Sequence, residues 1–137
     1  MPPPSPSDHV SFRLHLSDKI FYVKQFNPSD NIPVDYLNSL QTNSSNFISI
    51  TRTNEEISIV GETDDVSDKD ASWRCIRIAG PMDFGVTGVM CNFTTPLKAA
   101  NIPVFAVSTW NTDYILVPKD RAEQAVQALK EDGWTFV

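Results

Sequence analysis

The sequence predicts an α+β protein made of two modules in tandem, the first abbreviated and the second complete. Residues 10–61 hold short segments of alternating or β-branched apolar residues around one short helical pattern. Residues 62–72 are an acidic run without apolar periodicity. Residues 73–137 alternate strand and helix patterns in the order βαββαβ, which is the split pattern of ferredoxin-like folds. These three observations together give the predicted organisation.

The chain is expected to begin with a tail and a hairpin. Residues 1–9 are rich in proline and serine, which predicts a disordered tail. Apolar residues alternate from residue 10 to residue 16, and a second apolar segment covers residues 20–26. The polar turn Ser17-Asp18-Lys19 separates the two segments, so they are expected to pair as a hairpin.

The rest of the first module is expected to be one short helix and two strands. The helix follows Pro33, because apolar residues recur at helical spacing on one side: Val34, Leu37 and Leu40. The strands are expected at residues 47–52 and 56–60, which gives the order ββαββ. The acidic run that follows is too polar to bury itself, so it is expected to be a solvated linker. It lacks the residue spacing of a calcium-binding loop.

The second module is expected to open with a strand at residues 73–79 and a helix. One apolar helix face is marked by residues at spacings of three and four: Val86, Val89, Met90, Phe93 and Leu97. Pro96 is expected to kink or end this helix. Residues 102–107 are apolar at both parities, which predicts a strand covered on both faces by the other module or by another subunit.

The chain is expected to end with a strand, a helix and a last strand. The strand covers residues 113–117, and the helix covers residues 119–132 with Asp120 and Glu123 at capping-box spacing. Gly133 suits the position after the helix, and residues 134–137 are expected to form the final strand.

Charge and composition narrow the class of protein. The net charge of -6 opposes binding to a phosphate backbone, so nucleic acid is not an expected partner. The N-terminal segment has no apolar core of a signal peptide, and no segment is long enough to span a bilayer, so a cytoplasmic protein without membrane contact is expected. Cys75 and Cys91 are expected to be buried reduced thiols rather than a disulfide or a metal pair.

Two loops form the candidate site. One is the glycine loop, residues 80–88, between the first strand and the first helix of the second module. The other is the hairpin at residues 108–113, and the strand order predicts that the two loops meet. Their backbone N–H groups, hydroxyls and carboxylates suit a free amino acid, with Asp83 or Asp113 receiving the ammonium group. The alternative is that the same glycines and acids serve only turns and caps, and that Trp110 is an interface anchor rather than a ligand cover.

Catalytic groups are sparse in this sequence. His9 and His15 are the only histidines, and both precede the first predicted turn, so no histidine is expected to activate a nucleophile near the candidate site. The sequence holds no phosphate-binding loop, dinucleotide fingerprint or clustered metal ligands. We therefore expect no enzyme, no catalytic residue, no metal and no cofactor.

Two stretches of the second module resemble the ACT domain family. One runs from Trp73-Arg74-Cys75 through Gly80-Pro81-Met82-Asp83-Phe84 to Thr87-Gly88, and the other from Ser108-Thr109 through residues 112–117. The resemblance is closest to small stand-alone proteins with two ACT-like modules, related to aspartokinase regulatory modules and to cytosolic arginine sensors. In the first half, only residues 47–53 and 56–60 look like the family's other module.

The resemblance implies a regulatory protein that binds an amino acid and acts through a protein partner or a homo-oligomer such as a dimer. It also implies that two ferredoxin-like ACT modules lie in the chain, the first one shortened. The ligand contacts carried over from the family are Gly80, Asp83, Phe84, Thr87, Gly88, Ser108, Thr109, Thr112 and Asp113. Met82 and Gly85 match no position of the family. The alternative is a structural interaction module that keeps the ACT fold without a ligand.

Overall fold

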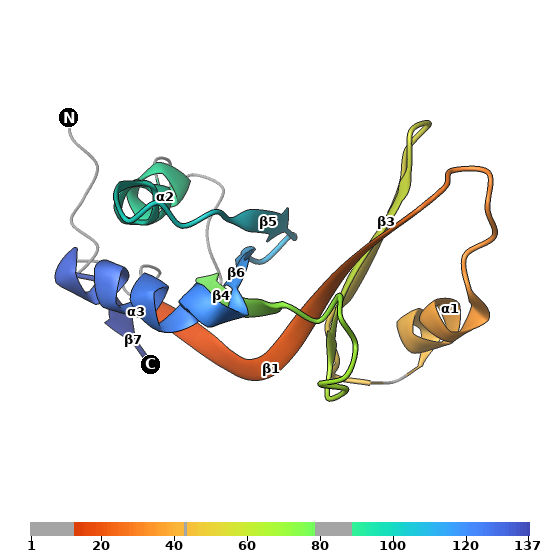
Figure 1. Ribbon diagram of the computed structural model, residues 1–137, viewed down its shortest axis with the longest axis horizontal. Coiled ribbons are helices and arrows are strands. Elements are labelled where there is room, and N and C mark those ends of the chain that lie inside the picture. The colour runs from red at the N-terminus through yellow and green to blue at the C-terminus, as the bar shows by residue number, and fades with distance from the viewer. Residues whose placement is uncertain (1–12, 43, 79–88) are drawn as a thin grey trace. The chain divides into compact units, whose positions relative to one another are not determined.

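The computed structural model describes residues 13–42, 44–78 and 89–137 (Figure 1). The chain divides into two compact units. Unit 1 combines the beginning of the chain, through Asp18, with Arg74–Val137, and unit 2 is Lys19–Trp73. The sequence analysis instead places residues 10–26 together in the first module. In the structure, the described residues before Lys19 belong to the same unit as Arg74–Val137.

The hairpin expected at the start of the chain is wrong, because β1 runs without interruption from Arg13 to Phe26 (Figure 1). The turn-like residues Ser17-Asp18-Lys19 remain extended inside it. In unit 1 the Ser17 carbonyl accepts hydrogen bonds from Nε and Nη2 of Arg74, at 3.1 and 2.7 Å. The backbone of this polar segment is therefore satisfied by a residue distant in the sequence rather than by a turn.

Unit 2 contains α1 (Val34–Gln41), β2 (Ile48–Arg52) and β3 (Ile57–Thr63) together with the second part of β1. The strands lie in the order β2-β3-β1 and are antiparallel. The first half is therefore βαββ rather than the expected ββαββ. One small buried cluster of the unit consists of Tyr22, Ile57, Ile59 and Ala71, and Phe21 and Val60 are buried as well. None of the residues of α1 is buried.

Unit 1 follows the predicted order of elements. Apart from Trp73, the first residue of β4, it holds β4 (Trp73–Ile78), α2 (Val89–Ala99), β5 (Phe105–Ser108), β6 (Asp113–Pro118), a 3-10 turn (Lys119–Arg121), α3 (Ala122–Glu131) and β7 (Thr135–Phe136). The strand order is β7-β1-β4-β6-β5, with Arg13 and Leu14 pairing in parallel with β7. The α+β class and the βαββαβ order are confirmed. Because β1 lies between β7 and β4, this half is not a self-contained ferredoxin-like module.

The core of unit 1 is built from both helices and the central strands. Helix α2 buries Val89, Phe93 and Leu97, and α3 buries Ala122, Ala125 and Leu129. The Phe93 and Trp134 rings meet edge to face, with centroids 5.6 Å apart. The apolar face predicted for the first of these helices is thus buried at Val89, Phe93 and Leu97 and partly buried at Met90.

Helix ends differ from the sequence expectations in two places. Pro96 lies inside α2, and the helix continues to Ala99. Helix α3 begins at Ala122 after the 3-10 turn and has no side-chain cap, so Asp120 does not form the expected capping box. The expectation for Gly133 is confirmed, because its φ of 100° is the left-handed conformation that ends a helix.

Two features of unit 1 differ from the sequence expectations. The strand expected at residues 102–107 is shorter, because β5 begins at Phe105, and within unit 1 its residues alternate between half-buried and exposed. Cover of its second face by the other module or by another subunit stays a prediction. Ile102 is buried before the strand begins, where its N–H donates to the Leu97 carbonyl at 2.9 Å. Cys75 is a buried thiol as expected, whereas Cys91 is an exposed one.

Candidate functional site

The structure describes one of the two loops of the candidate site. The predicted contacts of the glycine loop, Gly80, Asp83, Phe84, Thr87 and Gly88, lie outside the described residues. The predicted contacts of the hairpin, Ser108, Thr109, Thr112 and Asp113, lie at the connection between β5 and β6. The geometry of the site is therefore that of the hairpin and of its contact with β4.

The hairpin is closed by its own side chains. Ser108 and Asp113 are paired in register across β5 and β6, and Ser108 Oγ donates a short hydrogen bond to Asp113 Oδ1. The Thr109 N–H and hydroxyl both donate to the Thr112 carbonyl, at 2.9 and 3.2 Å. These bonds account for the serine and threonines at this spacing, because short hydroxyl side chains satisfy backbone groups in turns.

A buried hydroxyl fastens the hairpin to β4. Thr112 is only 4% exposed, and its Oγ1 donates to the Ile78 carbonyl at 2.7 Å. Ile78 is the last residue of β4, and Gly80 follows it by two positions in the sequence. The hairpin thus contacts the strand end from which the glycine loop departs.

Asp113 is the buried charged residue of the hairpin, with 6% of its surface exposed. Its Oδ1 accepts from Ser108, while a carboxylate can accept several further hydrogen bonds. The segment Ser108-Thr109-Trp110-Asn111-Thr112-Asp113 contains no cationic side chain. A buried carboxylate in such surroundings favours a positively charged hydrogen-bond donor. Trp110, at the turn, is 81% exposed.

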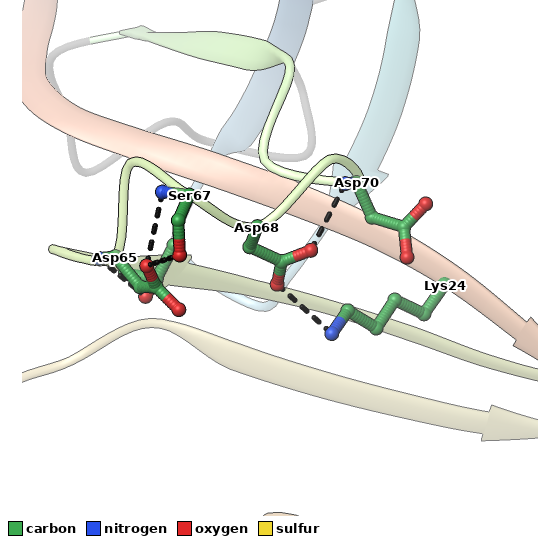
Figure 2. A network of polar contacts seen from close by, with 6 residues as sticks. Lys24, Asp65, Ser67, Asp68 and Asp70 are labelled. Carbon is green, nitrogen blue, oxygen red and sulfur yellow. Dashed lines mark hydrogen bonds and ion pairs between the residues drawn. The ribbon is translucent and has the colours of Figure 1, made fainter.

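Unit 2 contains a polar cluster that the sequence interpretation missed (Figure 2). Lys24 Nζ lies 2.9 Å from Asp68 Oδ2, and it also lies 5.2 and 5.9 Å from the ring centroids of Tyr22 and Tyr36. Burial alone lowers the pKa of Lys24, but hydrogen bonds with Asp68 and Tyr36 outweigh burial and raise that pKa above its usual value. The Lys24 ammonium lowers the pKa of Asp68, and burial raises the pKa of Tyr22. Both members of the ion pair are therefore held in their charged forms.

The acidic run folds into consecutive turns within unit 2 (Figure 2). Asp65 accepts from the Ser67 hydroxyl and from the Ser67 N–H at 3.0 Å, and these two bonds, the hydroxyl first, lower the pKa of Asp65. Asp68 accepts from the Asp70 N–H at 2.9 Å, so the carboxylate that pairs with Lys24 also closes a turn. The sequence signal was the spacing of two residues between an aspartate and the residue that donates to it, which is typical of Asx turns.

Two open cavities lie near other polar groups. One of about 790 Å³ lies beside Lys24 and has aromatic and acidic walls, which include Phe26, Tyr36, Asp35 and Asp70. Another of about 540 Å³ lies at the end of α2 and contains none of the predicted contacts. Among the described residues, no group of three His, Cys, Asp or Glu side chains is arranged to hold a metal ion. The described helices are also all too short or too polar to cross a bilayer.

The second half of the chain matches known proteins. The ACT domain family model matches residues 69–131, a range that includes the hairpin and its contact with β4. Curated relatives include the cytosolic arginine sensor for mTORC1 subunit 1 of Bos taurus, 38% identical over 64 residues, which are 44% of this chain and 20% of that protein. The Homo sapiens protein of the same name is 37% identical over 59 residues, covering 42% of this chain and 18% of its own length. The chain thus spans about a fifth of the length of these relatives.

Solved structures resemble most of the chain. Protein Atu0741 from Agobacterium tumefaciens is 28% identical with a TM-score of 0.75, and the match covers 91% of each chain. The ligand-free regulatory subunit of aspartate kinase from Thermus thermophilus is 10% identical with a TM-score of 0.63, covering 88% of this chain and 97% of that one. The second likeness is one of fold alone. Together these findings confirm the resemblance to the ACT domain family.

Proposed function

We propose that this chain, whose residues 69–131 match the ACT domain family, is a regulatory protein that binds a free amino acid in unit 1. The curated relatives are named as arginine sensors, and a structural neighbour is a regulatory subunit, which supports regulation rather than catalysis. The observation that carries the proposal is the buried Asp113 in a hairpin fastened to the end of β4. A cytoplasmic location is part of the proposal and follows the name of the relatives.

The proposed ligand contacts divide by charge. Asp113 receives the α-ammonium group, because among the described residues the Ser108 hydroxyl donates to this buried carboxylate, and a carboxylate bonds most strongly to a charged donor. The hydroxyls of Ser108, Thr109 and Thr112 add uncharged donors and acceptors beside it. The contacts proposed for the carboxylate and the side chain come from the glycine loop: Gly80, Asp83, Phe84, Thr87 and Gly88. This set requires no metal and no cofactor.

Regulation requires that the ligand prefer one state of the protein. We propose that this state differs in its assembly with a partner protein or with a second copy of the chain. The preference must come from contacts that the bound amino acid makes in one state and not in the other. The effect of the ligand on assembly is then measured by light scattering with and without the amino acid.

A thermal-shift screen against the standard amino acids tests the proposal. A ligand at about 100 times its Kd stabilises the folded state by roughly 2.7 kcal/mol, which is a clear shift in the unfolding temperature. Asp113→Asn is expected to weaken binding of the active amino acid by about tenfold or more, since it removes a charged acceptor. Asp120→Asn is the matched control, because Asp120 is an exposed aspartate of the same unit. A screen in which no amino acid shifts the transition contradicts the proposal.

The alternative is an interaction module that keeps the fold without a ligand. The bond between Ser108 and Asp113 favours this alternative, because it provides a structural reason for the buried acid. In that case Asp113→Asn changes the stability of unit 1, and no amino acid protects either the wild-type protein or the variant. Protection of the wild-type protein alone separates the two functions.

A further inference from the structure

Helix α1 of unit 2 carries a row of exposed apolar side chains. Val34, Leu37 and Leu40 lie three positions apart, so they are neighbours on one side of the helix. These side chains are in residues that are 63%, 36% and 53% exposed. Tyr36 of the same helix faces β1 instead, where its ring centroid lies 6.0 Å from that of Tyr22. Tyr36 thus holds α1 against unit 2 while the apolar row stays accessible.

Unit 2 is much more acidic than unit 1. Lys19–Trp73 contains nine Asp and Glu residues against four Lys and Arg residues, so it carries a net charge of -5 out of the -6 of the whole chain. Two of its four cations are already paired with carboxylates, Lys19 with Asp64 and Lys24 with Asp68. The surface of unit 2 therefore presents an excess of negative charge.

Part of this charge lies around α1. The helix itself contains the exposed Asp35 and no basic residue, and the exposed Asp30 precedes it by four positions. Asp70 lines the same cavity as Asp35, so the acidic run comes close to the helix. The cation in that cavity wall, Lys24, is the one paired with Asp68. An apolar row on α1 is thus combined with carboxylates that attract cations.

The charge decides between the possible occupants of the row. Two copies of the chain that met through α1 would bring two units of charge -5 together. The same repulsion opposes an anionic lipid surface. A helix that carries Lys or Arg beside its own apolar side buries the row and is also attracted by the carboxylates.

We propose that α1 is a docking surface for a basic amphipathic helix of another protein. The apolar side of that helix covers Val34, Leu37 and Leu40, and its cationic side chains lie near Asp30 and Asp35. Three side chains cover much less than the ~1,600 Å² of a standard protein interface, so the contact is weak and sensitive to salt. The inference goes beyond the proposed function, because it does not rest on amino-acid binding in unit 1.

A synthetic helical peptide of leucine, lysine and alanine, with its leucines on one side, is a suitable probe. The full chain labelled with nitrogen-15 is titrated with this peptide, and the amide resonances are followed by NMR. The expected result is a saturable shift of the amides of α1, with an affinity that falls as the salt concentration rises.

Two control peptides separate apolar burial from charge. One has the same composition with its leucines distributed around the helix, and the other has glutamate in place of lysine. Each is expected to bind about tenfold more weakly or worse, because the first lacks an apolar side and the second is repelled by unit 2.

A pair of valines tests whether the row is the contact. Val34→Ser is expected to weaken binding of the leucine-lysine peptide by about fivefold or more. Val66→Ser is the matched control, because Val66 is also an exposed valine of unit 2 but lies outside α1. It is expected to leave the affinity unchanged. Both residues are exposed, so both variants are expected to keep the fold, which circular dichroism checks.

Four outcomes overturn the proposal. One is the absence of a saturable shift in α1, and another is an equal response to either control peptide. The third is an equal loss of affinity in Val34→Ser and Val66→Ser, since binding then does not depend on the row. The fourth is a dimer of the chain, detected by sedimentation, that Val34→Ser dissociates, because a second copy then covers α1.

Discussion

The helices of the two units have similar apolar patterns and opposite environments. Leu97 of α2 is completely buried, whereas Leu40 of α1 is 53% exposed although it also belongs to an apolar row at helical spacing. In unit 1 two helices contribute to one core together with the strands. In unit 2 the cluster of Tyr22, Ile57, Ile59 and Ala71 is small, and the charged Lys24 lies 5.2 Å from the ring centroid of Tyr22. Helical periodicity therefore predicts which face of a helix is apolar, but it does not predict whether another element of the protein packs against that face.

Truncation of matched leucines gives the largest expected effect. Leu97→Ala is expected to destabilise the protein by about 2–5 kcal/mol, because it removes buried methyl groups and leaves a cavity. Leu40→Ala is expected to change the free energy of unfolding by no more than ~0.5 kcal/mol, since Leu40 is exposed. Urea unfolding followed by circular dichroism measures both. A Leu40→Ala cost equal to that of Leu97→Ala would show that a surface covers α1 in solution.

Substitution of two glycines by alanine compares the cost of steric crowding, at Gly61, with the cost of backbone strain, at Gly133. Gly61→Ala in unit 2 is expected to cost about 1–3 kcal/mol, because its Cβ would lie 2.3 Å from Tyr22 Oη. Gly133→Ala in unit 1 meets no atom within 4 Å, but its φ of 100° imposes a cost of roughly 1–2 kcal/mol on a residue with a side chain. The unfolding free energies of both variants provide the measurement. Truncation of Tyr22 to leucine is expected to relieve the cost at Gly61 and to leave the cost at Gly133 unchanged.

The ion pair between Lys24 and Asp68 gives the smallest expected effect. Asp68→Asn is expected to cost about 1 kcal/mol or less, as is usual for an ion pair near the surface. The pKa of Asp68 is lowered from 3.8, so its contribution is present above that value and is lost as the pH falls through the folded pKa. The pKa of Lys24 is raised from 10.5, so its contribution is present below that value and is lost as the pH rises through the folded pKa.

Urea midpoints across the pH range measure this linkage. The wild-type protein is expected to lose more stability than Asp68→Asn at both the acidic and the alkaline end. Asp64→Asn provides the control, because the Asp64 side chain is 84% exposed in its pair with Lys19. Parallel pH profiles for wild-type protein and Asp68→Asn would contradict the role given to this pair.

Local chemistry was misleading where a distant partner decides the conformation. Ser17-Asp18-Lys19 is typical of a turn, yet Arg74 satisfies the Ser17 carbonyl and β1 remains extended. The apolar segment at residues 102–107 predicted one strand, but β5 begins only at Phe105 and is an edge strand of unit 1 whose residues alternate in exposure. Arg74 is far from Ser17 in the sequence, and the position of β5 at the sheet edge depends on the order of the strands, so neither is contained in a local sequence pattern.

In the candidate site, too, the local features were predictable from the sequence and the contacts between distant residues were not. The hydroxyls and the acid of the hairpin were identified from residue type and spacing, and their mutual hydrogen bonds follow from that spacing. The bond from Thr112 to the Ile78 carbonyl joins residues far apart in the chain, so it depends on the order of β4 and β6 in the sheet. The contact between Lys24 and Asp68 was missed for the same reason.

The sequence by itself determined the α+β class, the apolar face of α2, the end of α3 at Gly133 and the residues of the hairpin. These features depend on side-chain periodicity and on the conformational preferences of single residues. Only the tertiary structure decided that β1 is continuous, that no residue of α1 is fully buried, and that Gly61 leaves space for the Tyr22 phenol. Burial and hydrogen bonding between distant elements depend on which surfaces meet, and a pattern within one element does not specify its partner.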